Sequence, residues 1–373
     1  MPGWSGVKNL LNEIEMKKIF PLLLAITWII ASCTSTGTST DKTRTIVDAL
    51  GRQVTIKSEP SRIVIAGKQT PMLTNFLFLF KTADTKLIAI EKRAQSTEDY
   101  LELVDINIGK KYLLEKGASA EQIAPLNPDI VILKTSMRDT IGKPLEDLSI
   151  SVIYVDFENI DQIYRDIRIF GELLNESNRG EELVSNYQDV YQQIQQKVLE
   201  DKPSEKPSVL ILQAVSSDQK YVFSVPAANW LQTNLIEKAE GIPASKETNQ
   251  TGGWSDINME QISEWDPDMI FVINYQGKAT EIVKQLKNDE IWQALKSVKN
   301  EKIYAFPFDY LSWDQPDPRW IIGYGWLAYK LNPQKITSSE IQSIIENFYG
   351  KFFLIDDKII QEKIIPKIAE YLK

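Results

Sequence analysis

Histidine is absent from this chain of 373 residues, and cysteine occurs only once. Without histidine the protein cannot form a Ser-His-Asp or Cys-His catalytic site, an HExxH zinc site or an imidazole-ligated haem or iron centre. A single cysteine excludes an internal disulfide and a zinc site built of several thiolates. The most common nucleophilic and zinc-dependent enzyme classes are therefore excluded.

Positive charge is also in deficit, with 42 Lys+Arg against 51 Asp+Glu and a formal net charge of −9. A nucleic-acid-binding protein would need a basic face, so the charge balance predicts no nucleic-acid partner. No GxxxxGK or GxGxxG motif occurs, and a nucleotide site has no support. The composition is 43% hydrophobic and 25% charged, which is typical of globular proteins, and the length predicts about two domains.

The first 43 residues have the pattern of a secretion signal followed by a tether. Two lysines at 17 and 18 precede an apolar run of about a dozen residues, which is too short for a bilayer core that needs ~20. The segment Ile30-Ala31-Ser32-Cys33 resembles a bacterial lipobox, in which the cysteine is lipidated. We expect a signal peptide at 1–32 with the natural start at Met16, and a lipidated tether at 33–43. The alternative is that Cys33 is a buried cysteine in a short helix.

Short β-branched runs alternate with segments of helical length in the next part of the chain. The runs lack polar alternation, which predicts strands of a mostly parallel sheet covered by helices on both faces. The expected strands are 62–66, 86–90, 129–133 and 152–155.

An internal repeat relates the two halves of the sequence. Glu121-Gln122-Ile123, followed after three residues by Asn127-Pro128-Asp129, recurs 139 positions later as Glu260-Gln261-Ile262 and Asp266-Pro267-Asp268. The segments beginning at Pro60 and Val152 recur in the same order, with offsets of 147 and 150. Three ordered matches with nearly constant spacing indicate two α/β lobes of related topology.

The segment between the repeats is helical in pattern. Apolar residues at i, i+3 and i+4 run through 160–174, break at 175–180 and continue to about 200. The sequence therefore predicts an α/β fold with an N-terminal lobe at 44–175, a connecting helix at 176–202 and a C-terminal lobe at 203–373. Each lobe is expected to contain a mostly parallel sheet with flanking helices, and one long helix bridges them.

Three segments, VDALGRQVTIKSEPSRIVI, EQIAPLNPDIVIL and GGWSDINMEQISEWDPDMIFV, carry a resemblance to a known family. With the lipobox and the helical connector, they are similar to the ABC-importer substrate-binding proteins of the iron-complex (siderophore) and cobalamin type. The resemblance covers residues 44–373 and implies a class III periplasmic-binding-protein-like fold with the ligand held between the lobes. It also implies a monomeric, non-enzymatic protein that is lipid-anchored at the extracytoplasmic face of the cell membrane.

The expected partners are a permease dimer and its ATPase. In the family, carboxylates at the positions of Glu121 and Glu260 contact arginines of the two permease subunits, and two matched anions suit a two-fold partner. The alternative is that each glutamate only favours the first turn of its helix through the helix dipole.

The expected ligand is a small metal chelate that brings its own Fe³⁺ or cobalt, so the protein itself needs no cofactor and no metal ligands. Ligands of open α/β sheets bind beyond the carboxyl ends of the strands, and an anionic chelate with flat apolar surface calls for cations and aromatic rings. The candidates are Lys68, Arg93, Arg138, Trp230, Trp254, Tyr275, Tyr310, Trp313 and Arg319.

The function expected from the sequence is capture of an iron–siderophore complex for delivery to the permease. Within the family the alternatives are a corrinoid (cobalamin) or haem ligand. Outside it they are an extracytoplasmic enzyme, for which no acid/base pair can be named, and a structural lipoprotein. A bare cation held by Asp309, Asp314 and Asp317 is a further alternative for the loop that contains Arg319.

Overall fold

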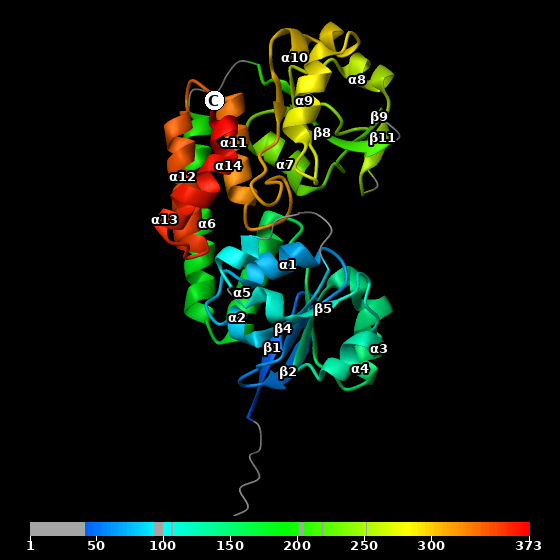
Figure 1. Ribbon diagram of the computed structural model, residues 1–373, viewed down its shortest axis with the longest axis vertical. Coiled ribbons are helices and arrows are strands. Elements are labelled where there is room, and N and C mark those ends of the chain that lie inside the picture. The colour runs from blue at the N-terminus through cyan, green and yellow to red at the C-terminus, as the bar shows by residue number, and fades with distance from the viewer. Residues whose placement is uncertain (1–41, 93–99, 106, 201–204, 218–219, 251) are drawn as a thin grey trace, which may run out of the picture. The chain divides into compact units, whose positions relative to one another are not determined.

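The computed structural model describes residues 42–92, 100–105, 107–200, 205–217, 220–250 and 252–373 (Figure 1). The signal peptide, Cys33 and Arg93 lie outside the described residues. Within the described ranges, no helix combines the length and the apolar character needed to cross a membrane.

The first large sheet has five parallel strands in the order β5-β4-β3-β6-β7. Four of them lie within one residue of the strands expected from the sequence, which confirms that prediction. Their bounds are β3 Ile63–Ile65, β4 Leu87–Glu91, β5 Tyr112–Leu114, β6 Ile130–Lys134 and β7 Val152–Val155.

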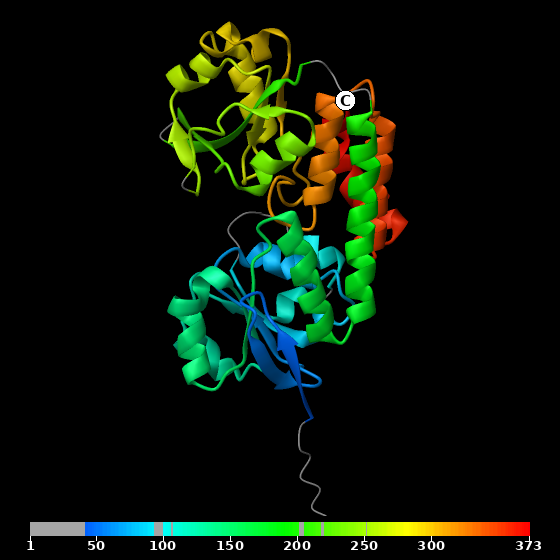
Figure 2. The ribbon, with the colours of Figure 1, turned by 180° about the vertical axis from the view of Figure 1, so that it is seen from behind.

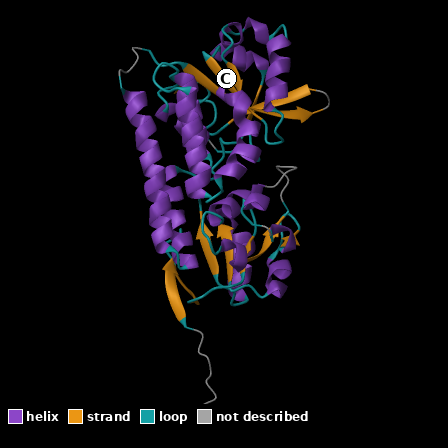
Figure 3. Ribbon diagram, turned by 60° about the vertical axis from the view of Figure 1, so that its left-hand side comes forward, coloured by secondary structure: helices purple, strands orange, loops and turns teal. Residues whose placement is uncertain are grey.

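Both faces of this sheet are buried, as the lack of polar alternation predicts. In β6, Ile130 and Ile132 pack into one hydrophobic cluster, whereas Val131 and Leu133 pack into a different one. Figure 3 shows helices on the two sides of these strands. The helices of this half are α1 Thr70–Leu77, α2 Ala83–Lys86, α3 Ala120–Ile123, α4 Lys143–Asp147 and α5 Ile160–Leu174.

The second large sheet is mixed. Its strands follow the order β11-β9-β8-β12-β13. The strands β8, β12 and β13 are parallel, β9 is antiparallel to both of its neighbours, β8 and β11, and β10 pairs in parallel with β8. The strands are β8 Ser208–Ser217, β9 Lys220–Val225, β10 Ile242–Pro243, β11 Ser255–Ile257, β12 Met269–Ile273 and β13 Ile303–Ala305. The helices of this half are α7 Leu231–Lys238, α8 Met259–Trp265, α9 Ala279–Asn288 and α10 Lys296–Lys299.

The internal repeat appears in the topology. The neighbours β3, β6 and β7 of the first sheet correspond to β8, β12 and β13 of the second, in the same order and all parallel. The α/β fold with two related sheets is therefore confirmed.

The strands β8 and β9 pair as an antiparallel hairpin, in which Val215 lies opposite Val222. The β-branched and aromatic residues at 221–223 favour a strand over a loop. A second hairpin that the sequence pattern did not reveal, β1 Thr43–Val47 with β2 Gln53–Lys57, precedes the first sheet.

The connector consists of two helices, as the broken apolar stripe predicts. The helix α5 ends at Asn175, which has the left-handed φ of 60°, and the helix α6 follows at Ser177–Leu199. Figure 2 shows α6 running beside α5 and then past the C-terminal helices. These are α11 Trp320–Leu331, α12 Ser338–Phe352, α13 Asp357–Ile359 and α14 Ile365–Ile368.

Candidate functional site

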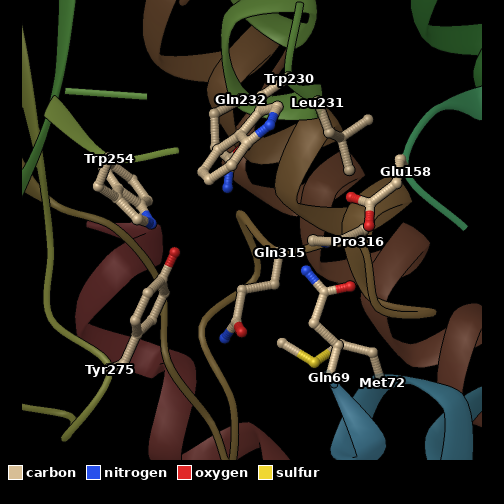
Figure 4. A pocket seen from close by; sticks show the side chains of 10 residues that line it. All are labelled: Gln69, Met72, Glu158, Trp230, Leu231, Gln232, Trp254, Tyr275, Gln315 and Pro316. Carbon is tan, nitrogen blue, oxygen red and sulfur yellow. The ribbon is translucent and has the colours of Figure 1, made fainter. Parts of the chain in front are cut away.

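A pocket of about 240 Å³ lies where loops of the two large sheets approach each other (Figure 4). Its residues come from the segments that follow β3, β7, β12 and β13, from the start of α7 and from the turn before β11. This is the position at which open α/β sheets bind ligands. The lining residues are Gln69, Met72, Glu158, Trp230, Leu231, Gln232, Trp254, Tyr275, Gln315 and Pro316.

Three aromatic rings form one wall of the pocket. The ring of Trp254 lies between those of Trp230 and Tyr275, with centroid distances of 5.7 and 6.2 Å. Both contacts are edge-to-face, at 84° and 69°, a favoured geometry for aromatic pairs. The sequence predicted these three residues as ligand contacts, and the structure brings all three to one pocket.

A buried carboxylate fixes two of the lining side chains from behind. Asp314 accepts hydrogen bonds of 3.0 Å from the Tyr275 hydroxyl and 3.0 Å from Nε2 of Gln232. Burial raises the pKa of Asp314, although hydrogen bonds from Ser312, Gln232 and Tyr275 oppose that change. Burial and the Asp314 charge also raise the pKa of Tyr275, so its phenol keeps its proton. Asp314, which does not line the pocket, therefore holds Tyr275 of the aromatic wall and Gln232 in place.

Gln69 lies in a strained turn on the side of the pocket opposite the aromatic wall. It follows β3, precedes α1, and has a left-handed φ of 55°, which is uncommon for a residue other than glycine. The turn is fixed at Gly67, whose N–H donates a hydrogen bond of 2.6 Å to Glu91. Strain held in place by surrounding contacts is frequent at ligand sites.

Glu158 is the one charged residue among those that line the pocket, and it is already paired. Its carboxylate lies 2.7 Å from Nζ of Lys134, which is buried and also donates to the carbonyl of Asp156. Burial lowers the pKa of Lys134, whereas the Glu158 carboxylate raises it. The pair supplies no net charge to a ligand.

Arg319, predicted to face the ligand, is fully buried and absent from the pocket lining. Nε lies 3.1 Å from Asp309 and Nη1 lies 2.9 Å from Asp317. The sequence pattern placed a cation beside three aspartates but could not show that two of them pair with it. Arg319 therefore pairs with two buried carboxylates in this structure, and its contact with a ligand stays a prediction.

The other predicted ligand contacts lie elsewhere. Trp313 and Tyr310 are buried outside the pocket lining, and Lys68 and Arg138 are exposed outside it. Arg93 lies outside the described residues. Among the described residues, none of the predicted cations lies beside the aromatic rings of the pocket. The three glutamines of the lining were not predicted, because an uncharged amide gives no signal that separates a ligand contact from a solvated loop.

Glu121 and Glu260 occupy equivalent positions, as the repeat predicts. Each is exposed in the first turn of its helix, α3 or α8. Each helix begins with a capping box, formed by Ser119 with Gln122 in one lobe and by Asn258 with Gln261 in the other.

Comparison with known proteins identifies the chain at the level of its family. The family described as periplasmic binding protein matches residues 85–310. The chain belongs to the periplasmic binding protein family.

Several curated family members are similar over most of this chain. The molybdate-binding protein MolA of Haemophilus influenzae is 23% identical over 340 residues, which cover 83% of this chain and 91% of that protein. The Fe(3+)-citrate-binding protein YfmC of Bacillus subtilis is 22% identical over 77% and 87% of the two chains. YvrC, an ABC transporter substrate-binding lipoprotein of B. subtilis, is 25% identical over 78% and 85%.

The fold agrees with this family. A periplasmic solute-binding protein from Veillonella parvula superposes with a TM-score of 0.72 at 22% identity, covering 89% of this chain and 100% of that one. The periplasmic binding protein described here is thus a non-enzymatic, solute-binding component of an ABC importer, with a permease as partner and a small ligand.

Proposed function

We propose that this periplasmic binding protein captures an iron–siderophore complex in the pocket between its two sheets and delivers it to the permease. The observation that carries the proposal is the wall of Trp230, Trp254 and Tyr275, since aromatic faces suit the apolar ligand shell of a metal chelate. A relative of similar length is named for binding Fe(3+)-citrate, which is itself an iron chelate.

Delivery would use Glu121 and Glu260. Both are exposed and stand at equivalent turns of the repeat, so together they present two matched carboxylates to a two-fold partner. Arginine side chains on the permease would bind them through bidentate hydrogen bonds.

Retention at the membrane would use Cys33. The lipobox-like segment before it and the tether after it match a lipid-anchored protein, and one relative is named as a lipoprotein. The anchor would hold the binding protein at the extracytoplasmic face, close to its permease.

The test is uptake of radioactive iron, supplied as a ferric siderophore, by cells that lack the chromosomal gene and carry a plasmid copy. Wild-type protein should restore iron accumulation, and Trp230→Ala/Trp254→Ala should not, although it reaches the same abundance. Equal iron uptake with and without the plasmid would contradict the proposed function.

A further inference from the structure

We infer that the pocket selects an uncharged ligand over an anion, and that the amides of Gln69 and Gln315 are the groups that make this selection. The inference rests on the proposed function, because it takes the pocket as the solute site. It goes further by assigning the charge of the solute and two specificity-determining residues.

The first observation is the charge of the lining. Among the ten described residues that line the pocket there is no lysine or arginine, and Glu158 is neutralised by Lys134 at 2.7 Å. An anion that left water for this pocket would lose its hydration without gaining a cationic partner among these ten residues. The described lining therefore provides no cation that compensates a negative ligand.

The second observation is the carboxylate behind the lining. Asp314 is fully buried, and the hydrogen bonds of its Oδ2 come from Tyr275 and Gln232, which both face the pocket. The side chains that donate to Asp314, those of Tyr275, Gln232 and Ser312, are neutral. A negative ligand would lie near an acidic group, whereas an uncharged one would not be repelled.

The third observation is a pair of polar atoms that have no hydrogen-bond partner among the described residues. Nε2 of Gln315, a residue that is 2% exposed, and Oε1 of Gln69 are both buried and make no hydrogen bond there. Figure 4 shows the Gln69 amide extending into the space between Gln315 and Glu158. Buried polar groups are normally hydrogen-bonded, so this donor and this acceptor point to a ligand that supplies one acceptor and one donor.

The remaining surface defines the rest of that ligand. Met72, Leu231 and Pro316 add apolar surface to the lining of the pocket, whose volume is about 240 Å³. An uncharged group with an apolar face and amide or hydroxyl functions fits both parts of the lining.

The experiment compares three probes of known charge by tryptophan fluorescence and calorimetry at low and high salt. These are an uncharged ferric tris-hydroxamate chelate, in which three single negative charges balance Fe³⁺, the ferric citrate anion, and molybdate. The uncharged chelate should bind at least tenfold more tightly than either anion, with an affinity that salt leaves unchanged.

Two variants link this preference to the amides. Gln315→Glu and Gln69→Leu should each weaken binding of the uncharged chelate at least tenfold, since a carboxylate cannot donate and leucine cannot accept. Gln188→Glu, at an exposed position on α6, is the matched control and should bind like wild type.

The outcomes separate the two claims. Tighter binding of an anion, or unchanged affinity in both pocket variants, would overturn this inference and leave the proposed function standing. If no probe binds to the wild-type protein, the proposed function itself is contradicted.

Discussion

Nη1 of Arg319 lies 2.9 Å from Oδ1 of Asp317, and neither side chain has any exposed surface. Asp317 also accepts a hydrogen bond from Asn75 of α1, so this ion pair connects the loop before α11 to the first half of the protein. The loop carries Gln315 and Pro316 into the pocket. The pair therefore holds part of the pocket lining in place.

We expect Arg319→Ala to destabilise the fold. Removing one partner leaves the carboxylates of Asp309 and Asp317 buried without their cation, which should lower the free energy of unfolding by about 3–5 kcal/mol. Denaturant unfolding followed by tryptophan fluorescence measures the change. Arg168→Ala, which removes the exposed pair with Glu181, is the control and should cost less than about 1 kcal/mol. A stable Arg319→Ala protein that no longer binds solute would instead restore this arginine as a ligand contact.

A second ion pair predicts an effect of pH on stability. The ion pair between Lys197 and Glu340 joins α6 to the start of α12. The Lys197 ammonium and the Thr337 N–H lower the pKa of Glu340 from 4.5 to about 2. Because the folded pKa is depressed, the stabilisation is complete above pH 4.5 and is lost as the pH falls towards 2. Glu340→Gln should therefore lower the free energy of unfolding at pH 7 by about 1 kcal/mol, since the pair is partly exposed.

Unfolding curves of wild type and Glu340→Gln between pH 7 and pH 2 measure this effect. The difference between them should shrink as the pH falls through that range. In the Lys197→Gln background, Glu340→Gln should cost less than in wild type. A difference that is constant over the whole range would refute the assignment.

The docking proposal predicts that transport and binding can be separated. Glu121→Gln/Glu260→Gln should abolish solute uptake by cells while the affinity of the purified protein changes less than about threefold, or roughly 0.7 kcal/mol. The control removes two other exposed carboxylates, in Glu172→Gln/Glu281→Gln, and should transport normally. Weakened solute binding by the first double variant would move these glutamates from the docking surface to the ligand site.

The anchor proposal concerns Cys33. Cys33→Ser should move the protein from the membrane to the soluble or precursor fraction, without a change in the solute affinity of the purified protein. Cell fractionation with immunoblotting measures its distribution and its size. Membrane-bound protein of mature size in the Cys33→Ser strain is incompatible with lipidation at this residue.

Much of the fold was predictable because its signals are local. Parallel strands buried on both faces are continuous apolar runs, and β6 and β7 were found within one residue of their expected positions. The break between α5 and α6 was visible as a loss of apolar periodicity near Asn175. The β8–β9 hairpin was missed because its polar termini resemble a loop.

The site was predictable only in part, because it depends on how distant loops meet. The rule for open α/β sheets predicted the edge at which the pocket lies, and Trp230, Trp254 and Tyr275 of the predicted residues line that pocket. Whether a loop cation faces the ligand depends on its pairing, and the sequence did not reveal that Arg319 pairs with Asp309 and Asp317. The orientation of Gln69 depends on a left-handed turn that no composition or spacing reveals.

Whether the pocket is the solute site can be tested by asking which small molecules the protein retains. Wild-type protein and Trp230→Ala/Trp254→Ala are incubated with the small-molecule fraction of spent culture medium and separated from unbound solutes by gel filtration. Each is then heated, and the released compounds are identified by mass spectrometry. We expect a compound that the wild type retains in an amount at least tenfold greater than the variant does. Circular dichroism should show that the variant is folded. Retention of the same compounds in the same amounts by both proteins would contradict this expectation.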